Sequence, residues 1–227
     1  ITICDGVEDI GIKAFKGCNN LKEIAIPDSV INLGDGVFYE CTSLETVEFP
    51  DGITSIGDNA FRCCTSLTSI EIPETVTSIG YGAFAECTNL MSVTIPEAVK
   101  SMGSEAFYEC TSLASVYISN LGSWCNIGFG EMESNPLCYA GDLYINGELA
   151  VNIIIPEGVT NIGFSTFRCC TSLTSVALPD SVTEIGQSAF SGCKGLTSIV
   201  FPKGLTYIGE KAFFGLLKSN IFSFFAN

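Results

Sequence analysis

The sequence contains no histidine and little positive charge. Of its 227 residues, 10 are lysine or arginine and 25 are aspartate or glutamate, for a formal net charge of -15. Histidine is the commonest general base and the commonest protein ligand for metals, so the residue most often used for acid-base catalysis and for metal binding is absent. An acidic surface also repels nucleic acid. We therefore expect neither an enzyme nor a nucleic-acid partner, and no cofactor or metal.

Long apolar runs and paired-cysteine motifs are also missing. Runs such as Phe224-Phe225-Ala226 fall far short of the roughly 18 residues that span a membrane, so we expect no membrane insertion by this segment. No C-x-x-C pair occurs, which leaves redox and zinc motifs without support. No signal peptide is visible and Ile1-Thr2-Ile3 already has a strand-like pattern, so we expect a fragment of a longer chain.

What the sequence does contain is a repeat of 23 residues in at least eight partial or complete copies. One column of the repeat is phenylalanine, at Phe15, Phe38, Phe61, Phe84, Phe107, Phe167, Phe190 and Phe213. A second column is cysteine, at Cys18, Cys41, Cys64, Cys87, Cys110, Cys170 and Cys193. Proline and leucine form two further columns that recur at the same spacing of 23 residues.

Each copy has the pattern of a strand followed by a turn and a return. The triplet Ile70-Glu71-Ile72 before Pro73 alternates apolar and polar residues, as a short strand does. A second apolar pair ends in Ile79-Gly80, and the following Ala-Phe is expected to lie in one or two helical turns. One unit cannot bury its own apolar face, so the copies must stack with equivalent strands side by side in a parallel sheet.

The full pattern, L-x-x-I-x-I-P-x-x-V-x-x-I-G-x-x-A-F-x-x-C, resembles the BspA-like leucine-rich repeat, which occurs in secreted bacterial and some protist surface proteins. The resemblance covers residues 1 to about 213. It implies an α/β repeat solenoid, a leucine-rich-repeat horseshoe with a parallel β-sheet on the concave side and short helices or turns on the convex side. It also implies adhesion or protein binding at the cell surface, without naming a partner.

We expect one leucine-rich-repeat domain over residues 1–227, with two irregular parts. The repeat at about 119–156 carries 14 extra residues, and its Asn146-Gly147 predicts a hairpin turn. The end at about 214–227 departs from the pattern, and a cap, a dimer contact and a severed repeat all stay open.

The cysteine column predicts buried free thiols, because its members occupy one core position of the repeat and a thiol fills a small apolar space. Two cysteines outside the column, Cys125 and Cys138, both fall in the enlarged repeat. They are the disulfide candidates if the protein is exported, and free thiols are the alternative.

Acidic residues follow the proline in six copies. Stacking would bring them near one another, as a calcium site requires, but no calcium-loop motif accompanies them, and a role in solubility is the preferred interpretation. These residues are Asp28, Asp51, Glu74, Glu97, Glu157 and Asp180.

The candidate binding site is the row of outward-pointing residues at the centre of the predicted strands, which are free to vary while the core columns maintain the fold. Tyr117 is the leading hot-spot candidate of an apolar stripe in the second half. The alternative is that the enlarged repeat buries this stripe under Trp124, Phe129 or Met132. The row comprises Glu48, Glu71, Thr94, Tyr117, Ile154, Ala177 and Val200.

Together these patterns predict a non-enzymatic, extracellular or cell-surface recognition domain that binds a protein through its concave sheet face. The partner class would be a host extracellular-matrix or cell-surface protein. Two alternatives stay open: a structural spacer or stalk that presents another domain, and an intracellular scaffold in which every thiol stays reduced.

Overall fold

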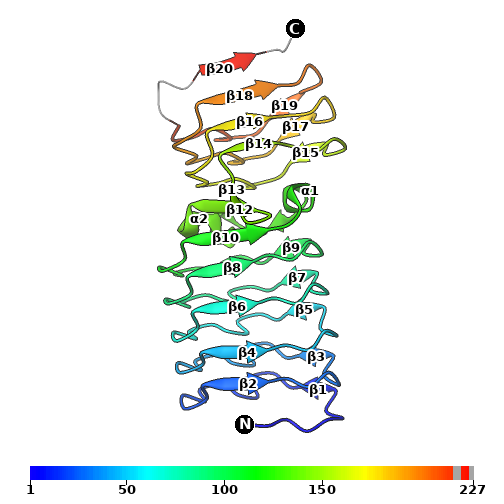
Figure 1. Ribbon diagram of the computed structural model, residues 1–227, viewed down its shortest axis with the longest axis vertical. Coiled ribbons are helices and arrows are strands. Elements are labelled where there is room, and N and C mark those ends of the chain that lie inside the picture. The colour runs from blue at the N-terminus through cyan, green and yellow to red at the C-terminus, as the bar shows by residue number, and fades with distance from the viewer. Residues whose placement is uncertain (217–220, 225–227) are drawn as a thin grey trace.

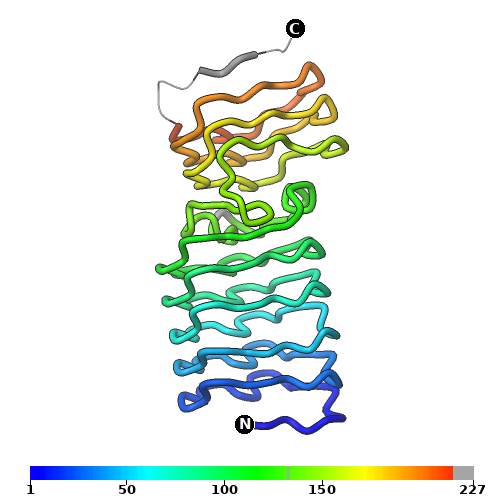
Figure 2. The backbone as a smooth tube through the Cα atoms, viewed as in Figure 1, coloured from blue at the N-terminus to red at the C-terminus, as the bar shows by residue number. Residues whose placement is uncertain are grey.

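The computed structural model describes residues 1–216 and 221–224, without the side chains of Met132 and Ile221–Phe224. Figure 1 shows coils of chain stacked along the long axis, with the first repeats at one end and the last described repeats at the other. Figure 2 shows the same stacking in the backbone and one irregular coil, at about the middle, where the enlarged repeat lies. The buried apolar side chains form one continuous cluster along the stack.

The first strands of the repeats follow one another in one ladder of parallel strands, which is divided into three separately hydrogen-bonded sheets. The register confirms the 23-residue step, since Ser69 pairs with Ser92 and Ser92 with Ser115. In a typical strand the central residue is buried and its neighbours are exposed, as the alternation predicts. The strands are β2 (Glu23–Ala25), β4 (Thr46–Glu48), β6 (Ser69–Glu71), β8 (Ser92–Thr94), β10 (Ser115–Ile118), β12 (Asp142–Ile145), β14 (Asn152–Ile154), β16 (Ser175–Ala177), β18 (Ser198–Phe201) and β20 (Ile221–Phe224).

The second apolar pair of each repeat forms a shorter strand in a second parallel ladder. The glycine that follows it allows neighbouring repeats to approach closely, because a Cβ at Gly103 would lie 2.5 Å from the backbone nitrogen of Tyr81. The strands are β1 (Asp9–Ile10), β3 (Asn32–Leu33), β5 (Ser55–Ile56), β7 (Ser78–Ile79), β9 (Ser101–Met102), β11 (Gly128–Phe129), β15 (Asn161–Ile162), β17 (Glu184–Ile185) and β19 (Tyr207–Ile208).

The third side of each regular repeat consists of tight turns. The backbone N–H groups alternate between two kinds of hydrogen bond. Some donate to the next repeat, as the Phe61 N–H does to the Ala83 carbonyl at 2.7 Å, and others close a turn, as the Cys64 N–H does with the Phe61 carbonyl at 3.0 Å. The residue before the column cysteine is left-handed, with φ of 63° at Glu86 and 55° at Glu109. Because hydrogen bonds within the turn alternate with bonds to the next repeat, and because a left-handed residue follows, the chain does not form a continuous α-helix here.

All the helices among the described residues lie in the enlarged repeat: α1 (Leu121–Cys125), the 3₁₀ turn η1 (Met132–Ser134) and α2 (Leu137–Ala140). The parallel-strand solenoid is therefore confirmed, while the horseshoe curvature and helices on the convex side of the regular repeats are not.

The phenylalanine column forms two stacks of rings in the core, one on each side of the enlarged repeat. Ring centroids lie 5.4 Å apart between Phe61 and Phe84 and 5.2 Å apart between Phe84 and Phe107, with the planes nearly parallel. The column cysteine reinforces this stack, because the Cys87 thiol donates to the Phe61 carbonyl of the preceding repeat at 3.1 Å. Burial raises the pKa of the Cys110 thiol to about 12. Buried free thiols are thus confirmed for this column, apart from a half-buried Cys18.

The enlarged repeat forms a hairpin and a core plug. Asn146 and Gly147 have φ of 52° and 83°, as a two-residue hairpin turn requires, and they connect β12 to the antiparallel β13 (Glu148–Leu149). Trp124 of α1 is only 1% exposed and donates its ring N–H to the Thr166 carbonyl at 3.0 Å. The predicted hairpin is confirmed, and Trp124 fills the core between the two halves of the stack.

Replacing Phe84 by alanine is expected to lower the free energy of unfolding by about 3–5 kcal/mol, because a fully buried ring is removed from the stack. Urea denaturation measures this loss. Phe214→Ala is the matched control: that ring is 65% exposed, and its removal is expected to change stability by less than about 0.5 kcal/mol. Equal effects of the two substitutions would contradict the role assigned to the ring stack.

Candidate functional site

The candidate site is the strand face, meaning the outward-pointing residue that comes third in each strand of the first ladder from β4 to β18. In its N-terminal half this face is polar. Glu48, Glu71 and Thr94 are all exposed. Register places Glu71 beside Thr94 and Thr94 beside Tyr117, whereas Glu48 belongs to the separate two-stranded sheet of β2 and β4.

Two tyrosines form the aromatic part of the strand face. Tyr117 on β10 and Tyr144 on β12 are register partners, and their half-buried rings stack with centroids 4.9 Å apart. Tyr144 does not follow from the periodicity, because the 23-residue step fails in the enlarged repeat. Its signal was the run from Asp142 to Ile145, whose alternation matches that of Ser115–Ile118.

The C-terminal half of the strand face is apolar. Ile154, Ala177 and Val200 follow one another in register. Ile154 is 78% exposed, while Ala177 and Val200 are half-buried. Trp124 and Phe129, the proposed covers, are themselves buried and contact each other edge to face at 5.5 Å.

An interruption of the sheet divides the two halves. On one side of it β12 pairs with the hairpin strand β13, and on the other β14 begins a new sheet whose first pairing is with β16. The structure therefore brings Tyr117 to Tyr144 and Ile154 to Ala177, but it does not join them into one continuous apolar stripe. The side chain of Met132 lies outside the described residues, so its role as a cover is not tested.

Cys138, one of the disulfide candidates, contacts Cys169 of the next repeat. Cys125 is buried and Cys138 half-buried, and the structure joins neither of them in a disulfide. A hydrogen bond from the Cys138 thiol, helped by the charges of Arg168 and Lys194, lowers the pKa of Cys169 to about 6 despite partial burial. A disulfide between Cys125 and Cys138 stays a prediction that this arrangement does not favour.

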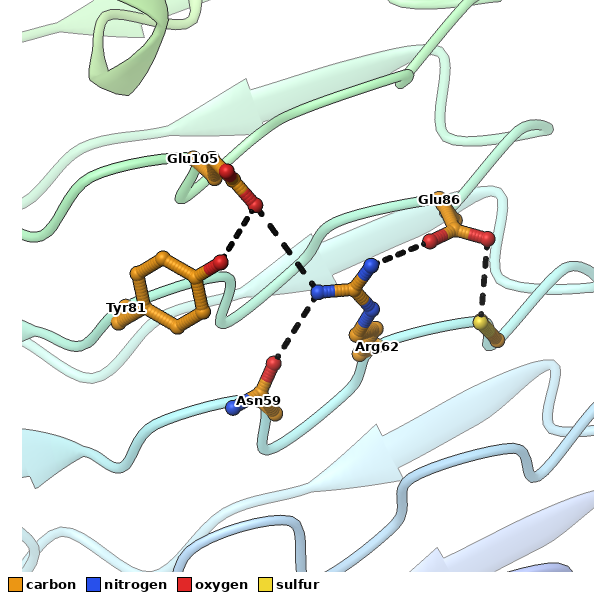
Figure 3. Close-up of polar contacts among 6 residues, drawn as sticks. Asn59, Arg62, Tyr81, Glu86 and Glu105 are labelled. Atoms are coloured by element: carbon orange, nitrogen blue, oxygen red, sulfur yellow. Dashed lines mark hydrogen bonds and ion pairs between the residues drawn. The ribbon is translucent and has the colours of Figure 1, made fainter. Parts of the chain in front are cut away.

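On the turn side, a polar network ties three repeats together. Figure 3 shows the Arg62 guanidinium between the carboxylates of Glu86, at 2.7 Å, and Glu105, at 4.0 Å. Tyr81 donates its hydroxyl to Glu105 at 2.7 Å, and Arg62 also contacts the side-chain oxygen of Asn59 at 3.5 Å. These groups satisfy one another, so we assign the network a structural role.

Neither a metal site nor a membrane span is found in the part of the chain that the structure describes. No three cysteine or acidic side chains there converge as a metal ion requires. One of the acids after the prolines, Glu97, accepts a hydrogen bond at 2.6 Å from Asn120, which also caps α1 by accepting from the Ser123 N–H. No helix among the described residues is long and apolar enough to cross a bilayer.

The repeat geometry agrees with a known family. The family model for the BspA type leucine rich repeat region matches residues 1–130 and 144–227 in six copies. The chain belongs to the BspA-type leucine-rich repeat family. Residues 131–143, which the family model leaves out, fall within the enlarged repeat. The BspA-type family is typical of bacterial surface proteins.

The chain is also similar to solved structures of leucine-rich repeat proteins. A leucine-rich repeat protein from T. pallidum is 29% identical, with 86% of this chain and 75% of that chain covered and a TM-score of 0.52. A leucine-rich cell surface protein from Faecalibacterium prausnitzii is also 29% identical, with 95% and 77% covered and a TM-score of 0.48. None of the curated proteins matches the chain.

Cys169 is expected to be the thiol whose alkylation continues at the lowest pH. The thiolate is the reactive form, so with a pKa of about 6 its rate should level off just above that pH and fall as the pH drops through it. Peptide mass spectrometry of the reduced, native protein treated with iodoacetamide resolves each site.

Cys138→Ala provides the matched variant, because it removes the hydrogen bond and should move the pH midpoint at Cys169 upward. Buried Cys110 serves as the internal reference and should stay unmodified. A midpoint at Cys169 that is unchanged by Cys138→Ala would contradict the contact between these two thiols.

Proposed function

We propose that this protein is a non-enzymatic recognition domain of a bacterial surface protein that binds another protein through its strand face. The observation that carries the proposal is the solvent exposure of the apolar half of that face. Ile154 is 78% exposed in register with Ala177 and Val200, where folding alone favours polar residues.

The surroundings of this apolar row support a protein partner. Ser175 and Ser198 flank it on the same strands and are half-buried. Across the interruption, the stacked Tyr117 and Tyr144 add an aromatic pair. An apolar centre with aromatic anchors and a polar rim is the usual composition of a protein-protein interface.

The chemistry of the exposed residues favours binding over catalysis. The chain has no histidine, and the strand face offers hydroxyls, carboxylates and apolar groups without a paired nucleophile and base. The family and the F. prausnitzii cell surface protein also favour a location at the cell surface, outside the cell. Host extracellular-matrix and cell-surface proteins are the partner class we propose.

Binding to a panel of immobilised extracellular-matrix and serum proteins tests the proposal. A Tyr117→Ser, Ile154→Ser double variant is expected to weaken saturable binding by at least about tenfold, mainly through faster dissociation, because hot-spot side chains contribute about 2 kcal/mol or more.

The matched control is Glu48→Gln, on the same face but in the separate sheet at the N-terminal end, which should bind like the wild type. The thermal unfolding temperature shows whether each variant stays folded. If no panel member binds the wild type, or if the double variant binds equally well, the spacer function becomes the better account.

A further inference from the structure

The interruption of the first strand ladder leaves a strand edge without a partner. Where the ladder is regular, an inner strand pairs with a neighbour on both sides, as β8 does with β6 and β10, although β4 and β6 do not pair with each other. At the enlarged repeat, β12 instead pairs with the antiparallel hairpin strand β13. The next strand, β14, pairs only with β16 among the described residues. Figure 1 shows β14 beginning the upper block of strands, next to β13.

The unpaired backbone groups of β14 belong to Asn152 and Ile154. The Val151 carbonyl accepts from the Thr174 N–H at 2.7 Å, and the Ile155 N–H donates to the Ala177 carbonyl at 2.9 Å, so these residues face β16. Alternate residues of a parallel strand bond to opposite neighbours. Asn152 and Ile154 therefore face the interruption, and no backbone partner for them occurs in the described part of the chain.

A groove of about 640 Å³ lies beside this edge. Its walls come from the N-cap and start of α1 (Asn120 and Leu121), from β13 (Glu148 and Leu149) and from β14 (Ile154). Leu149 is 42% and Ile154 78% exposed, so these apolar side chains border the open backbone edge together with the polar Asn120 and Glu148. The volume is within the range of binding clefts, about 300–1,000 Å³.

The charge around the groove selects the occupant. No lysine or arginine occurs between Lys100 and Arg168, a stretch that contains the whole enlarged repeat. Seven acidic residues occur in it, and Glu148 lines the groove itself. A second copy of this chain, also with a net charge of -15, would be repelled. A basic segment of another protein would be attracted.

We propose that the open edge of β14 binds an extended, lysine- or arginine-bearing peptide segment of a partner protein, which adds to the sheet as a further strand. Backbone hydrogen bonds to Asn152 and Ile154 would hold the segment, as in other cases of strand addition, and Glu148 would select its charge. This inference rests on the proposed function, since it specifies how a protein partner engages one part of the strand face.

A labelled heptapeptide in which lysine alternates with valine is the probe. Fluorescence anisotropy measures its binding to the wild type, to Ile154→Pro and to Ile154→Ser. Both variants remove the isoleucine side chain, but only proline removes the N–H that faces the groove. The β14–β16 ladder uses the neighbouring residues, so it stays intact in both. Unchanged fluorescence of Trp124, which is buried in the adjoining α1, verifies the fold.

We expect saturable binding that weakens by about tenfold or more in Ile154→Pro and by less than about threefold in Ile154→Ser, because backbone bonds dominate strand addition. Peptides with glutamate in place of lysine, or with methylated alternate amides, should not bind. Equal losses in the two variants would overturn strand addition but leave binding through side chains of the strand face standing. Absence of binding to the folded wild type, or binding of the methylated peptide, would also overturn it.

Discussion

Contact between one repeat and the next is the constraint on which the whole molecule depends. A single repeat has no partner for its phenylalanine ring, for its column thiol or for half of its backbone groups, and each of these finds its partner in a neighbouring repeat. The ring of Phe84 packs between those of Phe61 and Phe107, and the Cys87 thiol donates to the Phe61 carbonyl. The stability of each repeat therefore depends on its contacts with the adjacent repeats. An insertion that breaks the 23-residue step has to restore those contacts within the repeat that carries it.

The enlarged repeat restores the contacts in this way, and it creates the features that distinguish this protein from a solenoid of regular repeats only. Trp124 is buried in the enlarged repeat, and its ring N–H bonds to the next repeat. Buried Asn135 donates to the carbonyls of Ser165 and Thr166 and so fastens the insertion to the following coil. The hairpin ends one sheet and β14 starts another, which exposes Ile154 and a backbone edge together.

Much of this architecture could be predicted from the sequence, because the columns repeat and each reports one local role. The strand triplets, the Asn146-Gly147 turn and the buried thiols follow from periodicity and residue chemistry alone. The turn side could not be predicted, since its left-handed positions are occupied by residues such as Glu86 and Glu109, which carry no signal for that conformation. The contact between Cys138 and Cys169 could not be predicted either, because it depends on how the enlarged repeat packs against the next repeat.

Amide hydrogen exchange measured by NMR shows, without any partner, whether β14 has an open edge on the exposed strand face. The Ile155 amide donates to the Ala177 carbonyl and should be strongly protected, whereas the Ile154 amide faces the groove and should exchange orders of magnitude faster. Fast exchange at Ile154 beside slow exchange at Ile155 is the result this account predicts. Equal protection of the two amides would mean that the edge is already covered within the chain, and would contradict it.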